Sequence, residues 1–409
     1  MCQPFLCPPF MPQLRGVGHA MLLVAALLFS PWGNASAATA TAEEATRALF
    51  SFTPEGFSSP LEFHVSLPKG YSQNDKRYYL LLDLHPRSHA YLAGMHDWMS
   101  HNGEWPWPQS LVVTPSGRHP QFSQLYQAFM DDNSDTRVVA VLQQLLHLVD
   151  RRYRGNGFHI YSGFMGNGAL GLTLLLQQPQ LFNAYFIASP SISNEFAQAA
   201  NKQLRALSKR DNRIRTLYLN SGNHNFEQGS LAAIATFEQA LQQAAPTQLH
   251  WRLERSPEHY YMSRPVITTL NGIEMLFDDL HSPLSVDSAI SQQGAEAIIE
   301  HYQDLSQRKY GLPVSAQQSL IALANSQLAS QPQQAIAIFK RVTALYPTDA
   351  YAHSALADAY LELGQFSQAI AAQTAAVKHS KTMIKWHQNH HQQRLTKFEK
   401  MATLPKTAP

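Results

Sequence analysis

Apolar runs of strand length alternate with helical patterns along the front part of the chain. Tyr78–His85 is a continuous apolar run, as expected for a strand buried on both faces of a sheet. We expect strands at 59–71, 78–85, 110–117, 158–163, 184–191, 214–225 and 248–261, and helices at 138–153, 169–182 and from the last strand to about 280. This alternation predicts an α/β fold with a mostly parallel sheet, covered on both faces and binding ligands at the carboxyl ends of its strands.

The pattern changes from about Ser315, where the chain becomes alanine-rich and helical. Two units align with a constant offset, so that Ala335 pairs with Ala369 and Ile336 with Ile370. The second unit follows the pattern of a tetratricopeptide repeat, a helix pair, at Leu356, Ala357, Tyr360, Gly364, Phe366 and Ala369. An ordinary helical bundle is the alternative, because such arrays usually need three repeats.

A last helix, at about 382–402, could cap these repeats. From Lys378 onward the chain has seven Lys or Arg residues and one acid, Glu399. His387, His390 and His391 share one face of this helix. A metal site there is not favoured, because no carboxylate stands at a ligand spacing.

The N-terminus is typical of a secretory signal peptide. Arg15 precedes a short apolar run at 20–29, and Pro31 and a small-residue site at 35–37 follow. We therefore expect export to the periplasm or the medium. An N-terminal membrane anchor is the alternative. Both cysteines lie inside this segment, so a cleaved chain would have no disulfide and no cysteine nucleophile.

Composition adds limits rather than a function. The chain has 409 residues, 44% of them hydrophobic and 15% charged, which indicates a globular protein. A formal net charge of +2 gives no case for nucleic acid as a partner. The predicted organisation is a signal peptide at 1–37, an α/β domain at 38–282, a helical linker at 283–314, repeats at 315–381, and a basic helix and tail at 382–409.

The segment YSGFMGNGAL, at 161–170, has the form of a hydrolase nucleophile turn. In that turn, with the pattern G-x-S-x-G, a strand bends sharply into a helix and the backbone is crowded, so the neighbours must be small. Gly163 fits, Gly166 follows the central position, and Asn167 stands where the last glycine is expected. The central position itself holds Met165.

Around this turn the chain resembles the esterase family of α/β-hydrolases that includes siderophore esterases and S-formylglutathione hydrolases. The resemblance covers roughly 58–380 and includes FHVSLPKGY, RYYLLLDLH, LVVTPSGR, the run from VDRRY to SPSI, LYLNSGNHN, PEHYY, HYQDLSQRKYG and the repeats. It implies an α/β-hydrolase sandwich followed by a small all-α tetratricopeptide-like domain. It also places the nucleophile on Met165, the acid on Asn225 and the base on His259. The amides of Gly166 and Arg87 would form the oxyanion hole.

This set of residues cannot run serine chemistry. The thioether of Met165 has no proton to give to a base, and the amide of Asn225 cannot balance an imidazolium charge. Among other serines, Ser162 precedes the turn, and Ser189 and Ser191 suit a pocket wall. Glu227 is the nearest substitute for the missing acid.

The loop after the early strand suggests a second chemistry, a metal site. It holds His85, His89, His96, Asp97, His101 and Glu104. Because these residues lack a known ligand spacing, we favour no metal and no cofactor. Trp98, Trp105 and Trp107 could stack on a ligand or simply pack the loop, and we place Trp98 at the pocket.

Three hypotheses remain for the function. The first is a hydrolase fold that has lost its chemistry and binds a ligand, such as an ester or aryl compound. The second is an active esterase with an unusual nucleophile and His259. The third is a scaffold in which the repeats bind a protein partner. We favour the first, and the oligomeric state stays open.

Overall fold

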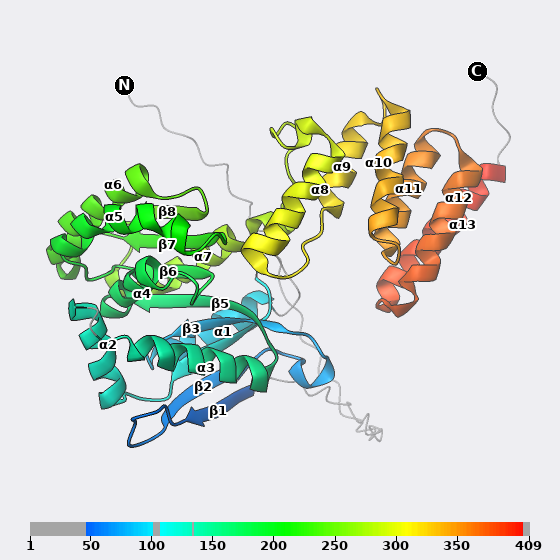
Figure 1. Ribbon diagram of the computed structural model, residues 1–409. Coiled ribbons are helices and arrows are strands. Elements are labelled where there is room, and N and C mark those ends of the chain that lie inside the picture. The colour runs from blue at the N-terminus through cyan, green and yellow to red at the C-terminus, as the bar shows by residue number, and fades with distance from the viewer. Residues whose placement is uncertain (1–45, 101–106, 133–134, 404–409) are drawn as a thin grey trace, which may run out of the picture. The chain divides into compact units, whose positions relative to one another are not determined.

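The computed structural model describes residues 46–100, 107–132 and 135–403 (Figure 1). The predicted signal peptide lies outside these residues. One eight-stranded sheet has the order β1-β2-β4-β3-β5-β6-β7-β8. Its strands are β1 (Thr46–Phe52), β2 (Leu61–Leu67), β3 (Tyr78–Asp83), β4 (Ser110–Pro115), β5 (Gly155–Phe164), β6 (Ala184–Ala188), β7 (Arg215–Ser221) and β8 (Leu249–Arg255). Strands β4 to β8 and β3 run parallel, which confirms the mostly parallel sheet.

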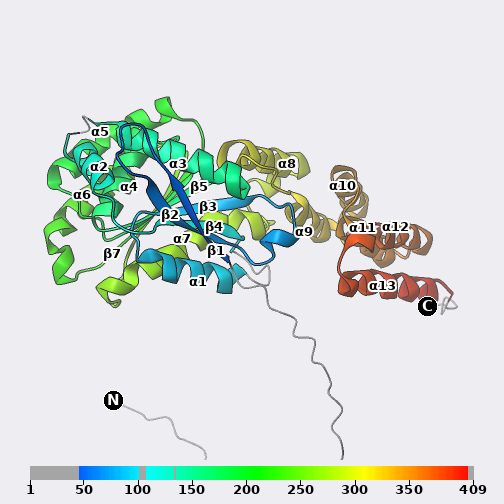
Figure 2. The same cartoon turned by 90° about the horizontal axis from the view of Figure 1, so that it is seen from below.

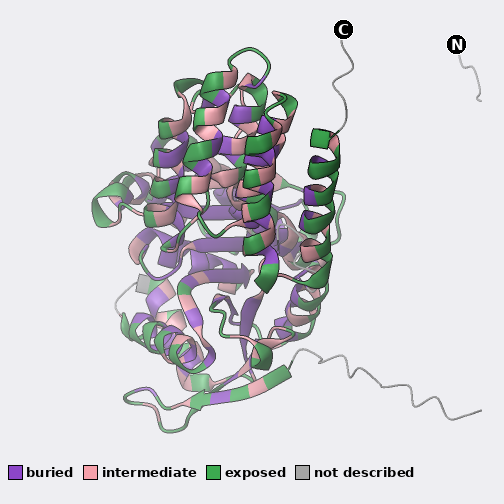
Figure 3. Ribbon diagram, turned by 90° about the vertical axis from the view of Figure 1, so that its right-hand side faces the viewer, coloured by how far each residue is buried: buried purple, intermediate pink, exposed green. Residues whose placement is uncertain are grey.

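The edge hairpin differs from the expected alternation. Strand β1 pairs with β2, and β2 with β4, in antiparallel register. The sequence pattern does not predict β1, because its apolar positions do not alternate cleanly with polar ones. In the structure most of its residues are exposed (Figure 3). It is the outermost strand, where a weak pattern suffices.

Helices cover both faces of the sheet (Figure 2). One face carries α1 (Ser88–Ser100) and α7 (Arg264–His281); the other carries α2 (Pro120–Asp132), α3 (Arg137–Tyr153), α4 (Gly166–Gln177), α5 (Asn194–Arg210) and α6 (Gln228–Ala244). Successive residues of a strand point to opposite faces. Leu80 and Leu82 of β3 accordingly enter the core beneath α2 to α6, whereas Leu81 enters the core beneath α1 and α7.

The expected linker is helical and packs against α7. Helix α8 (Ala295–Asp304) continues into a π-helix at Leu305–Tyr310. There the buried ammonium of Lys309 donates to Asp279 Oδ2 at 2.7 Å and to the Leu276 carbonyl at 2.8 Å. These bonds satisfy a lysine that burial would otherwise penalise.

The C-terminal part consists of two helix pairs and a last helix, as the sequence predicts. The pairs are α9 (Gln317–Gln327) with α10 (Pro332–Leu345), and α11 (Ala350–Glu362) with α12 (Phe366–His379). Helix α13 (Lys385–Thr403) follows and packs on α12. Among the described residues, no helix combines the length and hydropathy that a membrane span requires.

Candidate functional site at the β5–α4 elbow

The turn between β5 and α4 has the strained geometry of a nucleophile elbow. Met165 has φ 54° and ψ −118°, a conformation that a side chain with a Cβ rarely adopts. A Cβ on Gly163 would lie 2.5 Å from the carbonyl oxygen of Asn167, so only glycine fits there. At Gly166 a Cβ would meet nothing within 4 Å. The crowding expected at Gly163 is therefore present.

The end of β6 holds this turn in place. The Met165 amide donates to the Ala188 carbonyl at 3.2 Å, and the Met165 carbonyl accepts from the Ser191 amide at 3.1 Å. Ser189, between these two residues, has φ 42°. Two strained residues thus lie side by side, with the Met165 side chain 39% exposed at the carboxyl edge of the sheet.

The two expected oxyanion donors differ in their surroundings. Gly166 is the first residue of α4, where an amide has no acceptor inside the helix. The amide of Arg87 instead donates to Nδ1 of His85 at 3.2 Å, within its own loop. That loop is fixed by Asp83, whose Oδ1 accepts from the His85 amide at 2.8 Å.

Asp83 is buried at the end of β3 and also binds Ser162. The Ser162 hydroxyl donates to Asp83 Oδ2 at 2.9 Å. Burial raises the pKa of Asp83, although the His85 amide and the hydroxyls of Ser162 and Ser88 oppose that rise. Ser162 thus points into the protein and serves to anchor the loop.

The predicted acid position faces solvent, while a carboxylate two residues later is buried. Asn225 is exposed at the start of a short 3-10 helix, Asn225–Glu227. Glu227 Oε1 accepts from the Ser189 hydroxyl at 2.7 Å and from the Gly222 amide at 2.8 Å. Its Oε2 accepts from the His224 amide at 3.0 Å. The Glu227 carboxylate is therefore used to shape the loop.

Arg264 is the buried partner of Glu227. Its Nε lies 3.3 Å from Glu227 Oε2, and both side chains are almost fully buried. Burial would raise the pKa of Glu227, but the bonds from Ser189, Gly222 and His224 and the Arg264 charge outweigh it and lower that pKa. Gly222 is required here because a Cβ would overlap the Arg264 guanidinium.

Arg264 also fixes the loop that carries the predicted base. Its guanidinium donates to the carbonyl oxygens of Ser256, at 2.8 Å, and His259, at 3.2 Å. The His259 ring is exposed, and its Nε2 lies 3.4 Å from Glu258 Oε1. The structure brings the loops of Met165, Asn225 and His259 to one edge of the sheet, but no hydrogen bond or ion pair within the described part of the chain links these three side chains.

An aromatic row lines this edge. Phe164 packs on Tyr261 with ring centroids 4.9 Å apart, Tyr261 stacks on His224 at 5.5 Å, and His224 stacks on Phe226 at 5.1 Å. Phe226 is 74% exposed, so the row ends in an open ring face. The sequence alone did not single out these rings. The available signal was their place: Phe226 directly follows Asn225, and Tyr261 ends the PEHYY segment.

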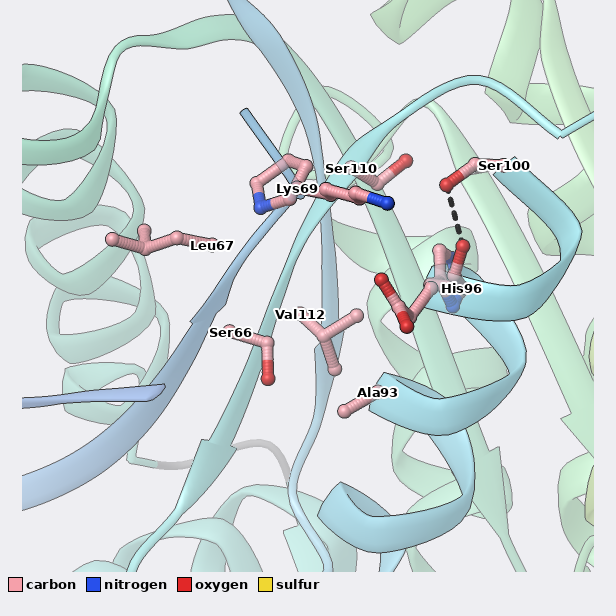
Figure 4. Close-up of a pocket in the computed structure, with 10 residues that line it drawn as sticks. Ser66, Leu67, Lys69, Ala93, His96, Ser100, Ser110 and Val112 are labelled. Carbon is pink, nitrogen blue, oxygen red and sulfur yellow. Dashed lines mark hydrogen bonds between the residues drawn. The ribbon is translucent and has the colours of Figure 1, made fainter. Parts of the chain in front are cut away.

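The predicted pocket residue Trp98 lies on a different part of the fold. The same turns of α1 contribute His96, Asp97 and Ser100 to a hollow that also includes Lys69 and Ser110 (Figure 4). Ser110 begins β4, so this hollow is at the amino ends of the parallel strands, opposite the elbow.

The histidine-rich loop has structural bonds rather than a metal-ligand arrangement in its described part. His89 contacts the hydroxyls of Ser66, at 3.2 Å, and Thr114, at 3.0 Å. His96 Nδ1 donates to the Leu92 carbonyl at 2.9 Å. In the described chain no three His, Cys, Asp or Glu side chains gather as metal ligands would. Positions 101, 104 and 105 lie outside it.

Comparisons with known proteins agree with this architecture. A tetratricopeptide repeat model matches residues 328–379. A solved structure of an uncharacterised protein from Capnocytophaga ochracea has a TM-score of 0.60 at 14% identity, covering 87% of this chain and 100% of that one. An IroE-like serine hydrolase from Shewanella oneidensis has a TM-score of 0.53 at 18% identity, covering 72% and 98%. A search of the curated proteins found no match. The chain has an esterase-like α/β-hydrolase fold followed by an all-helical tetratricopeptide region.

Proposed function

We propose that this chain is an exported hydrolase-fold protein that binds an ester or aryl ligand at the elbow without hydrolysing it. The observation that carries the proposal is Met165 at φ 54° and ψ −118°. The strained backbone of a nucleophile turn is retained with a side chain that cannot attack a carbonyl. Strain of this kind persists where the surrounding structure fixes it, and it concentrates at functional sites.

The ligand class follows from the surface around Met165. The row from Phe164 to Phe226 offers stacking faces, and the nearby side chains of Tyr260 and Met262 are also exposed. A planar aromatic group gains both area and ring geometry on such a surface. Thioethers such as Met165 and Met262 adapt to ligands of different shape.

Two further parts of the proposal, a protein partner and export, rest on the C-terminal and N-terminal parts of the chain. The tetratricopeptide region, matched at 328–379, supports binding of a protein partner. The N-terminal pattern of charge, apolar run and small residues supports export.

Calorimetry with a phenyl ester tests binding, and chromatography of the same solution tests turnover. We expect saturable binding, weakened in Met165→Asp, and unchanged ester after prolonged incubation. Absence of binding, or the appearance of phenol, would count against the proposal.

One observation favours a second candidate, a working esterase. Ser189 has φ 42°, lies beside the elbow and donates to a carboxylate, Glu227, at 2.7 Å. Ser189 is buried, so this function would require a movement that exposes its hydroxyl and breaks its bond to Glu227. Loss of any measured turnover in Ser189→Ala would support it.

A further inference from the structure

Helix α13 is fixed to the rest of the protein by few buried side chains. Of its 19 residues, His391, Leu395 and Phe398 are buried. The others are mainly polar or basic, as in the last helix of a repeat array, which faces solvent on one side. One of the three anchors is therefore a side chain that can take up a proton.

The His391 ring has no hydrogen-bond partner at either nitrogen among the described residues. It is fully buried where α11, α12 and α13 meet, with the Tyr351 ring 4.8 Å away and tilted by 64°. A neutral imidazole leaves one donor and one acceptor unpaired in this place. An imidazolium would leave two donors and a buried charge, which costs considerably more.

The backbone of His391 is locked by a buried ladder across the three helices. The Gln373 amide on α12 donates to the His391 carbonyl at 2.9 Å, and its oxygen accepts from Ser354 on α11 at 3.0 Å. Both partners are buried. This ladder fixes the backbone of His391 on α12 and ties α13 to both preceding helices.

The surroundings of the ring are unfavourable for a positive charge. The nearby titratable or charged groups are His387, His390 and Arg394 from α13 and Tyr351 and Asp349 from α11, while α12 presents the uncharged Gln373. Arg394 is itself ion-paired with Asp358 of α11. Burial, followed by His390, Arg394 and His387, lowers the pKa of His391 below its usual 6.5, and Asp349 opposes this only in part.

We propose that α13 is an acid-released cap, which undocks when His391 is protonated and uncovers the face of α12 that carries Gln373. Above about pH 6.5 the imidazole is neutral in both the docked and the released helix, and docking is at full strength. As the pH falls below that value, the released helix takes up a proton that the docked helix excludes. The release equilibrium should then rise by roughly tenfold per pH unit.

Hydrogen exchange of the full chain at about pH 7.5 and 5, corrected for the intrinsic pH dependence of exchange, tests this. We expect residues 385–403 to lose at least about tenfold in protection at the lower pH. Strands β5 and β6 should keep theirs. His391→Met should remove the pH effect, whereas the matched change His390→Gln, one residue away, should preserve it.

Equal protection of α13 at both pH values would overturn the proposal. A parallel loss in β5 and β6 would also do so, since it would indicate global unfolding. If α13 does not dock in His391→Met, NMR titration of the His391 ring in the wild-type chain replaces that variant as the test. Titration at an ordinary pKa with α13 still docked would contradict an acid-released cap.

Discussion

The amide of Met165 donates to the carbonyl of Ala188 across 3.2 Å, and this bond ties the strained elbow to the end of β6. Ser191 returns a bond to the Met165 carbonyl at 3.1 Å. A non-glycine residue at φ 54° costs about 1–3 kcal/mol, and it persists only where its surroundings fix it. The neighbouring strand therefore maintains a nucleophile turn whose side chain is a thioether.

Replacing Met165 by glycine should relieve that strain. The residue is 39% exposed, so only part of its apolar surface is buried, and we expect the relief of strain to leave a net stability gain of up to about 1 kcal/mol. Urea unfolding measures it. The same change at Met275, inside α7, should destabilise by about 1–3 kcal/mol. Equal losses at both sites would contradict the strained elbow.

The crowding beneath the elbow predicts opposite outcomes for two nearby glycines. Gly163→Ala would place a Cβ 2.5 Å from the Asn167 carbonyl oxygen and should cost about 2–4 kcal/mol. Gly166→Ala meets no atom within 4 Å and should change stability by less than about 1 kcal/mol. Thermal unfolding of both variants compares them directly, and a tolerated Gly163→Ala would show that the turn is looser than described.

The Glu227–Arg264 pair should be essential to the loops of the site. Glu227→Gln leaves the Arg264 charge buried without a counter-charge, and we expect a loss of about 3–5 kcal/mol. Glu258, exposed beside His259, offers the control: Glu258→Gln should cost less than about 1 kcal/mol. Similar losses from both changes would argue against this role of the buried pair.

The same pair predicts that the free energy of unfolding falls at acid pH. The pKa of Glu227 is lowered in the folded state, so its contribution is complete above the ordinary value of 4.5. It is lost as the pH falls from that value through the folded pKa. Glu227→Gln should therefore flatten the acid limb of a stability–pH curve measured by urea unfolding. If the fall in stability at acid pH is the same in Glu227→Gln, other titratable groups cause it.

Ligand binding should depend on the open end of the aromatic row. Phe226→Ala should weaken binding of a phenyl ester by about 1 kcal/mol, roughly fivefold, because one stacking face is lost. Trp98→Ala is the matched control, since the neighbouring residues of α1 line the hollow at the other end of the sheet. Calorimetry with both variants tests this. If Trp98→Ala weakened binding of the phenyl ester more than Phe226→Ala, the ligand would bind near that hollow and not at the elbow.

The fold could be predicted largely from the sequence because buried parallel strands such as β3 and β6 are continuous apolar runs. The elbow could be predicted because only small residues fit such a bend, as at Gly163. Edge strand β1 escaped prediction, since an outer strand needs little apolar pattern.

The polar frame of the site could not be read from the chain. Arg264 begins a helix and Glu227 precedes one, positions where charged residues usually face solvent. Their pairing arises only when the loops after β7 and β8 meet in the fold. Likewise, the family resemblance placed Asn225 and His259 in two loops at the carboxyl ends of strands, but it could not show that both side chains face outward.

Turnover of short chromogenic esters by the purified chain, beside its His259→Ala and Ser189→Ala variants, tests the central claim most directly. The account predicts the same rate for all three proteins, equal to the rate in buffer. Wild-type hydrolysis that disappears in His259→Ala or Ser189→Ala would contradict it and would place a working nucleophile elsewhere at this edge of the sheet.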